Sequence, residues 1–255
     1  MNVAAFIQAR VGSTRLPSKV IMPLQDRTVL EHVVGRVRQS RLVEETIVVT
    51  TMNKQDLPIV RICAENEIRV FCGSESDVLD RFYQAAKLVD SRHIVRITGD
   101  CPMMDPDIID RVVALHQEAG SDYTSNVIVE RFPDGEDVEI FTFAALGRAW
   151  RDASLVSERE HVTPYLRKHP EIFKLSSLEC ETDLSMHRWT LDTQEDYEFI
   201  KKVYEGLYLE KKYFRMNDVL IFLDKNPDLT AVNAHIKRNE GYLKSLREDR
   251  RQKGG

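Results

Sequence analysis

The chain has 255 residues and a mass of 29.5 kDa, with 42% hydrophobic and 30% charged residues. This balance is typical of a globular protein that buries its own core. The net charge of -5 and a pI near 5.9 argue against broad attraction to nucleic acid or another polyanion, so any basic residues that matter must act locally.

The N-terminal residues contain no basic region followed by a long apolar core, and no apolar run is long enough to span a bilayer. We therefore expect a cytoplasmic protein without a membrane partner. The four cysteines, Cys63, Cys72, Cys101 and Cys180, lie far apart and form no Cys-x-x-Cys pair. This pattern predicts reduced thiols rather than a structural zinc site.

Strand-like and helix-like runs alternate over the first half of the chain. The predicted strands are residues 3–7, 46–50, 69–71 and 93–98, and apolar residues recur at helical spacing over 29–37 and 78–89. Continuous apolar strands are typical of a sheet covered on both faces. We predict an α/β fold with a mostly parallel or mixed central sheet and helices on both faces.

A basic loop, residues 10–19, follows the first predicted strand. Gly12 allows backbone N–H groups to approach an anion, and Arg10, Arg15 and Lys19 bring positive charge to the same place. The spacing matches neither a P-loop nor a dinucleotide-binding fingerprint. A basic turn alone is more often simply solvated, but its position at the carboxyl end of a strand and two later segments favour a phosphate site.

The second segment covers residues 98–106, directly after the strand that ends near Ile97. We expect Asp105 to cap the helix that includes Ile108. Asp100 comes too early for that role and lies at the sheet edge that carries the basic loop. A carboxylate beside bound phosphates is a typical Mg2+ ligand, so we predict that Asp100 binds magnesium.

The pattern changes near residue 127. We predict a turn at 133–135, strands at 138–141 and 173–175, and helices over 143–150 and 158–167. This region, residues 127–180, would form a β-containing arm on a single domain of residues 1–243. A strand-like run at 189–191 and a helix over 197–207 follow, and the densely charged residues 244–255 are expected to fray.

The third segment covers residues 188–197. Thr193 is placed to cap the following helix, with Asp196 completing a capping box. Asp192 has no part in this cap and ends a strand-like run, so it could face Asp100 across the site. Two carboxylates and a basic loop together favour metal-assisted phosphoryl transfer.

These segments together resemble the cytidylyltransferase family. The likeness rests on residues 10–19, 73–82, 99–102 and 191–197 and extends from about residue 3 to 208. Within the family it is strongest to the spore coat polysaccharide group, which residues 157–165 support, and the synthetases of CMP-octulosonate and CMP-sialate are related. The resemblance implies a nucleotide-diphospho-sugar transferase (Rossmann-like) fold, CTP as a substrate, Mg2+, and a homodimer built on the arm.

The resemblance also implies roles for particular residues. It implies that Asp100 and Asp192 are metal ligands and that Arg81 and Thr98 lie near the nucleotide. The residues that would bind the triphosphate are Arg10, Gly12, Ser13, Arg15 and Lys19. Lys19, Arg10 and Arg15 would offset charge on the leaving pyrophosphate. The product would be a CMP-linked small molecule for surface polysaccharide or glycan synthesis.

The acceptor is the least defined part of this prediction. Asp134, Glu136, Asp137, Glu139 and His161 form a polar set, of which Asp137, Glu139 and His161 are the acceptor candidates, although a solvated turn and helix face would show the same pattern. Two alternatives remain open from the residues alone. One is a nucleotide-sugar glycosyltransferase, which would more typically show Asp-x-Asp, and the other is a non-catalytic nucleotide-binding subunit.

Overall fold

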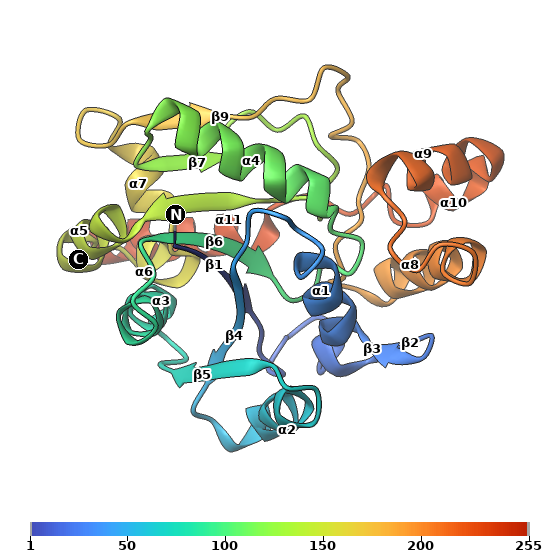
Figure 1. Cartoon of the computed structure of the whole chain (residues 1–255), viewed down its shortest axis with the longest axis horizontal. Helices are drawn as coiled ribbons and strands as arrows, with labels where there is room; N and C mark the ends of the chain where they lie inside the picture. The colour runs from blue at the N-terminus through green and yellow to red at the C-terminus, as the bar shows by residue number, and fades with distance from the viewer. Residues whose placement is uncertain (1, 254–255) are drawn as a thin grey trace.

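The computed structural model describes residues 2–253 (Figure 1). The strands are β1 (Val3–Gln8), β2 (Pro23–Leu24), β3 (Arg27–Thr28), β4 (Glu45–Thr51), β5 (Arg69–Gly73), β6 (His93–Thr98), β7 (Tyr123–Ser125), β8 (Glu139–Thr142) and β9 (Leu175–Ser177). The helices are η1 (Lys19–Ile21), α1 (Val29–Val37), η2 (Lys54–Asp56), α2 (Leu57–Glu65), α3 (Val78–Leu88), α4 (Pro106–Ala119), α5 (Phe143–Asp152), α6 (Val156–His161), α7 (Pro164–Lys168), α8 (Gln194–Leu207), α9 (Met216–Lys225), α10 (Pro227–Ala231) and α11 (Glu240–Lys253).

A seven-stranded sheet with the order β5-β4-β1-β6-β8-β7-β9 forms the centre of the fold. The four strands β5, β4, β1 and β6 are parallel, as predicted from the continuous apolar runs. β8 pairs antiparallel with β6 and with β7, and β9 pairs parallel with β7. The strands of the region 127–180 therefore extend the main sheet, and the sheet is mixed.

Helices cover both faces of the sheet, as the sequence predicts. Along β1, Ala5 and Ile7 face a core formed with α1, α2 and α4. Ala4 and Phe6 point to the opposite face, where α3, α5 and α7 pack. This alternation follows from the two-residue period of a strand. A third apolar cluster joins α8 and α9, which lie beyond the sheet at the right of Figure 1.

Two predicted elements differ in the structure. Residues 189–191 form no strand, because no neighbouring strand pairs with them, and the only bridge at this point in residues 2–253 joins Asp134 to Arg188. The helix predicted over 158–167 is divided into α6 and α7 at Val162, whose φ of 70° is incompatible with a continuous right-handed helix.

The charged tail is helical where fraying was predicted. α11 packs against α6, and Ser245 and Asp249 are 2% and 5% exposed. The Asp249 carboxylate accepts a hydrogen bond of 2.9 Å from the backbone N–H of Ser157 in α6. Polar rather than apolar contacts hold this helix, which explains why its composition suggested a loose end; residues 254–255 lie outside the described part.

Candidate active site

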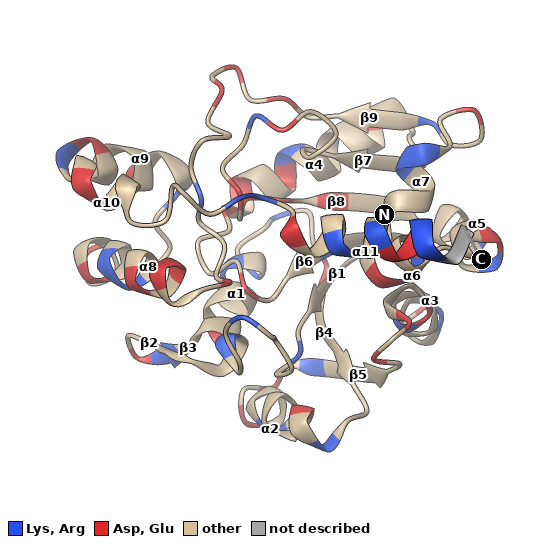
Figure 2. Cartoon of the chain, turned by 180° about the vertical axis from the view of Figure 1, so that it is seen from behind, with Lys and Arg blue, Asp and Glu red and all other residues tan. Residues whose placement is uncertain are grey.

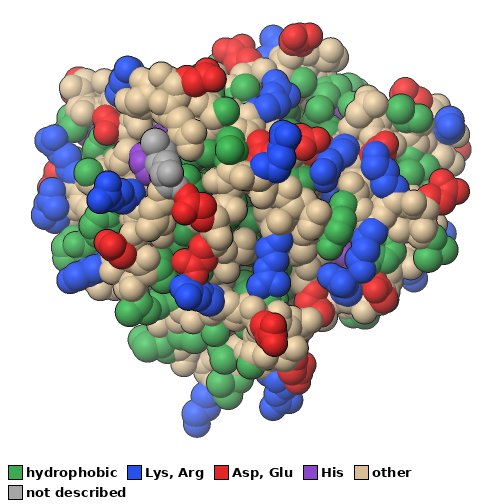
Figure 3. Space-filling model, in the orientation of Figure 1, with side chains coloured by type: hydrophobic (Ala, Val, Ile, Leu, Met, Phe, Trp, Pro, Cys, Tyr) green, Lys and Arg blue, Asp and Glu red, His purple; other side chains and the backbone are tan. Residues whose placement is uncertain are grey.

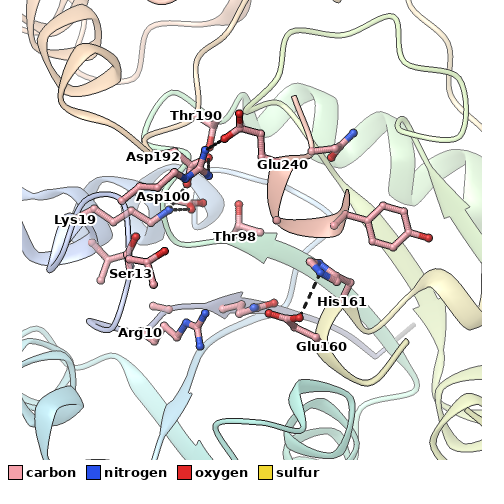
Figure 4. A pocket seen from close by; sticks show the side chains of 18 of the residues that line it. Arg10, Ser13, Lys19, Thr98, Asp100, Glu160, His161, Thr190, Asp192 and Glu240 are labelled. Carbon is pink, nitrogen blue, oxygen red and sulfur yellow. Dashed lines mark hydrogen bonds and ion pairs between the residues drawn. The ribbon is translucent and has the colours of Figure 1, made fainter. Parts of the chain in front are cut away.

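A cavity of about 560 Å3 opens at the carboxyl ends of β1 and β6. The basic loop and the two predicted metal ligands form one end, and α6 with the start of α11 forms the other (Figure 4). Eight basic and five acidic side chains are among the described residues that line it, although the whole chain carries a net charge of -5. The excess of basic side chains is a local feature of the cavity. Elsewhere basic and acidic side chains are mixed, as on the surface seen in Figure 3 and along α11 in Figure 2.

The basic loop is held by a buried carboxylate beneath it. The backbone N–H of Val11 donates to Asp56 Oδ1 at 2.6 Å, and the Thr51 hydroxyl donates to the other oxygen of Asp56, which is fully buried. The loop then closes on itself through a 3.0 Å bond from Ser18 N–H to the Val11 carbonyl. Ser18 adopts a φ of 62° and directs the chain into η1, which begins at Lys19.

Lys19 lies between the two aspartates that the sequence predicts as metal ligands (Figure 4). Its Nζ atom donates to Asp100 Oδ2 and, at 2.7 Å, to Asp192 Oδ1. Burial alone would lower the pKa of Lys19, but the two carboxylates outweigh burial and raise it well above its usual range. Burial would raise the pKa of Asp192, yet Lys19 and Arg15 keep it below its ordinary value. Lys19 and Asp192 thus stabilise each other's charged form.

Asp100 follows β6 at a close approach of two strand ends. A Cβ on Gly99 would come within 3.0 Å of the Gln8 carbonyl oxygen, so only glycine fits without a shift of the chain. Cys101 beside it is 3% exposed, and burial raises the pKa of its thiol well above the ordinary range. A neutral buried thiol is a poor nucleophile.

Asp192 is fixed by the capping structure of α8. The Asp196 carboxylate accepts backbone hydrogen bonds of 2.9 and 3.0 Å from Asp192 and Thr193, which confirms the predicted cap at Thr193. Arg188 donates to Asp196 at 2.9 Å and to Asp192 at 3.1 Å, and also to Asp134 at 2.8 Å. Arg188 therefore ties the turn after β7 to the metal-ligand candidate.

The remaining predicted nucleotide-binding residues divide into two groups. Arg10, Ser13, Arg15, Arg81 and Thr98 all line the cavity. Gly12 does not line it; a Cβ at this position would lie 2.8 Å from the Gln55 side chain, which packs against the loop there.

Arg81 is 1% exposed and donates to the carbonyl of Ser74 at 2.8 Å. Burial and the nearby Arg10 lower its pKa to about 10, and within residues 2–253 no carboxylate forms an ion pair with it. A buried guanidinium at the cavity wall that lacks a carboxylate partner is well placed to meet an anionic ligand.

The three acceptor candidates do not come together. His161 lines the cavity, whereas Asp137 and Glu139 lie outside it. Glu139 is buried and accepts hydrogen bonds from Arg96, from Tyr123 at 2.6 Å and from Thr163 at 2.6 Å. Its full set of partners marks it as part of the fold.

Asp137 is paired with Arg238, whose guanidinium lies 2.6 Å away. Burial raises the pKa of Asp137 to about 7, against the opposing charge of Arg238. This pair holds the segment that leads into α11 against the turn after β7.

The structure adds a wall that sequence reasoning missed. Residues 237 and 239–242 and Lys244 line the cavity opposite the basic loop. Glu240 Oε2 lies 2.6 Å from Arg15 Nη1, and Ser245 lies 3.0 Å from His161 Nε2. Nothing in the local pattern of a charged tail reveals these partners, because each is more than 80 residues away in the chain.

The two aspartates fit a magnesium site in their chemistry. No group of three or more His, Cys, Asp or Glu side chains in the described part of the chain is arranged to hold a metal. Mg2+, however, commonly uses one or two carboxylates together with substrate phosphates. Asp100 and Asp192 both reach the same Lys19 nitrogen and keep 19% and 21% of their side chains exposed, so one cation among bound phosphates could contact both.

The fold and this site define a nucleotide-binding α/β protein with a mixed sheet. The sequence model of the cytidylyltransferase family matches residues 4–221, and the chain belongs to that family. It is 36% identical over 234 residues to the spore coat polysaccharide biosynthesis protein SpsF of Bacillus subtilis, covering 89% of this chain and 96% of that protein.

Two solved structures share the fold, and the first is also similar in sequence. A cytidylyltransferase from Leptospira borgpetersenii is 37% identical, with a TM-score of 0.85 over 90% of this chain and 97% of its own. A CMP:2-keto-3-deoxy-manno-octonic acid synthetase in complex with CTP shares the fold at 14% identity, with a TM-score of 0.61 over 81% of this chain and 99% of its own. No helix within residues 2–253 is long and apolar enough to cross a membrane.

Proposed function

We propose that the protein transfers CMP from CTP to a small-molecule acceptor and releases pyrophosphate, in the synthesis of a surface polysaccharide or glycan precursor. The observation that carries this proposal is the Lys19 ammonium held between Asp100 and Asp192 at the mouth of the basic loop. Family membership and the likeness to SpsF support the nucleotide and the pathway class.

The acceptor oxygen would attack the α-phosphorus of CTP, and the bond to the pyrophosphate oxygen would break. This chemistry needs positioning and charge neutralisation more than covalent participation by the protein. Arg10, Arg15 and Lys19 would bind the phosphates and offset the charge that collects on pyrophosphate. Asp100 and Asp192 would hold Mg2+, which shields the phosphate charges and orients the reacting group.

The other nucleotide contacts are proposed on position. Arg81 and Thr98 line the same cavity, and Ser13 lies in the basic loop. His161 is the one acceptor candidate retained, because it faces the cavity from α6. Burial lowers the pKa of His161 to about 4, so its imidazole is neutral at pH 7 and can exchange hydrogen bonds with an acceptor hydroxyl.

We also propose a homodimer built on residues 127–180, and a cytoplasmic location, where CTP is available. β9 is an edge strand of the sheet, and Ile128 and Val129, which follow its neighbour β7 in the chain, are 39% and 42% exposed. An edge strand beside exposed apolar side chains is suited to pairing with a second copy. Light scattering of the full chain, compared with an Ile128→Asp/Val129→Asp variant, tests this part of the proposal.

The principal test is nucleotide-dependent stabilisation, followed by pyrophosphate release. Wild type, Lys19→Ala and Asp100→Ala are melted with CTP, UTP, ATP or GTP, with and without Mg2+, and Lys87→Ala serves as an exposed control. A ligand at about a hundred times its Kd adds roughly 2.7 kcal/mol to the folded state.

A CTP-selective, Mg2+-dependent shift that both site variants lose supports the proposal and justifies an acceptor screen. Stabilisation by nucleotide sugars alone would favour glycosyl transfer. The absence of any nucleotide shift would favour a non-catalytic subunit.

A further inference from the structure

Glu240 places a carboxylate on one of the arginines proposed to bind the triphosphate. Its Oε2 atom lies 2.6 Å from Arg15 Nη1, while Arg15 Nη2 contacts Asp192 at 2.9 Å. Both nitrogens at the end of this guanidinium are therefore taken by carboxylate oxygens. An arginine fork binds carboxylate and phosphate oxygens with the same geometry, so a phosphate can replace Glu240 without moving Arg15.

The segment around Glu240 is anchored independently of this pair. Arg238 bonds to Asp137 at 2.6 Å, and the Ser245 hydroxyl donates to Glu160 at 2.5 Å. Both anchors lie within five residues of Glu240. The Glu240 side chain is 47% exposed, so it can rotate away from Arg15 while α11 stays in place.

Glu240 also faces the cavity itself, as the close-up in Figure 4 shows. A carboxylate in this position repels an incoming polyphosphate until it moves aside. Its effect falls on ligands that reach Arg15, whereas a nucleoside monophosphate would not reach it because the β- and γ-phosphates are missing.

We propose that Glu240 occupies the place on Arg15 that the β- and γ-phosphates of the nucleotide take, and that the two exchange when the nucleotide binds. The inference rests on the proposed function, since it assigns the triphosphate to the basic loop. It makes Glu240 a specificity-determining residue that raises the cost of triphosphate and pyrophosphate binding. After CMP has been transferred to the acceptor, the return of Glu240 to Arg15 competes with pyrophosphate and favours release of that product.

The test compares Glu240→Gln with wild type by isothermal titration of the full chain with CTP, CMP and inorganic pyrophosphate, each with Mg2+. Glu248→Gln is the matched control, because Glu248 lies on the same helix and forms no ion pair with the described residues. Since exposed ion pairs contribute modestly, we expect Glu240→Gln to bind CTP and pyrophosphate roughly two- to fivefold more tightly, with the Kd for CMP unchanged.

Equal tightening for CMP, unchanged affinity for CTP and pyrophosphate, or weaker binding of both would overturn the exchange. Glu240 also stands in the first turn of α11, where an acidic residue can simply stabilise the helix. That role alone would lower the melting temperature of Glu240→Gln and leave its affinities unchanged.

The pyrophosphate titration distinguishes failure of the Glu240 exchange from failure of the proposed CMP transfer. Tighter pyrophosphate binding by Glu240→Gln, in a protein that neither selects CTP nor releases pyrophosphate from it, would sustain the exchange and refute the proposed function. Turnover of CTP by wild type, together with an unchanged pyrophosphate affinity in Glu240→Gln, would sustain the proposed function and refute the exchange. Wild type that binds neither ligand would overturn both.

Discussion

The Nζ atom of Lys19 lies 2.7 Å from Oδ1 of Asp192, although 173 residues separate them in the chain. Lys19 begins the short helix after the basic loop, and Asp192 precedes α8. Their contact joins two distant segments of the chain at the site. The Lys19 ammonium also offsets the repulsion between the carboxylates of Asp100 and Asp192. The central residues of the cavity are thus positioned by tertiary folding.

Lys19→Ala should abolish most turnover. The buried ammonium is charged at every physiological pH because its pKa is raised, and loss of one such preorganised group typically costs about 100- to 1000-fold in rate. Pyrophosphate release from CTP measures the loss, and Lys87→Ala, an exposed change on α3, should be neutral. Near-normal turnover of Lys19→Ala would refute its role in charge neutralisation.

Asp192→Asn should weaken the response to magnesium. The amide removes one anionic ligand candidate but preserves the size of the side chain. We expect the Mg2+ concentration for half-maximal pyrophosphate release to rise by about tenfold or more. Asp228→Asn, which alters an exposed carboxylate in α10, is the control. An unchanged Mg2+ requirement would show that Asp192 does not contact the metal.

Arg188→Ala should destabilise the fold. The guanidinium pairs with Asp134, Asp192 and the fully buried Asp196. Truncation leaves Asp196 without an ion-pair partner among the described residues, whereas Asp192 keeps Lys19 and Arg15. Breaking a buried pair in this way typically costs about 3 kcal/mol or more. Urea unfolding measures the change, with the exposed Arg250→Ala as control. A loss below about 1 kcal/mol would mean that water replaces the guanidinium at these carboxylates.

Stability should fall as the pH drops below 6.5, because buried histidines must stay neutral. Burial lowers the pKa of His32 and of His116 to about 4, from an ordinary value of 6.5. Between these values the unfolded chain binds more protons, so the contribution is complete above pH 6.5 and is lost toward pH 4. Each histidine should cost roughly 2 kcal/mol of the unfolding free energy between pH 7 and pH 5.

Urea unfolding at the two pH values checks this expectation. His32 bonds to the Leu24 carbonyl at 2.7 Å and packs edge-on against Tyr204. His32→Gln should therefore lower stability at pH 7 and reduce the difference between pH 7 and pH 5. A variant that keeps the full wild-type difference would exclude His32 as a source of the pH dependence.

The parallel half of the fold is readable from sequence because its signals are local. β-branched runs mark β4 and β6, and the strand-to-helix order places Lys19 and Asp100 at one sheet edge. Residues 189–191 misled this reasoning, since an apolar run shows burial without showing whether a strand lies alongside. The α/β class with helices on both faces of the sheet was therefore predicted correctly, while the strand at residues 189–191 was not.

Pairing between distant charges explains why the sequence did not reveal the surroundings of two carboxylates, Glu139 and Glu240. Glu139 looked available for an acceptor, but Arg96 and Tyr123 satisfy it within the core. Glu240 was assigned no role from the sequence, yet it forms an ion pair with Arg15. The sequence shows which residues are charged, but only the folded structure shows which charged residues pair with one another.

The position of α11 has a consequence for how the protein is made. The basic loop, Asp100 and Asp192 leave the ribosome well before residues 237–244, which complete the cavity wall. A chain shortened just after residue 221 would keep everything that the family model matches, yet it would lack Glu240 beside Arg15 and Arg238 beside Asp137. Such a fragment would end inside α9 and would lack the cavity wall opposite the basic loop.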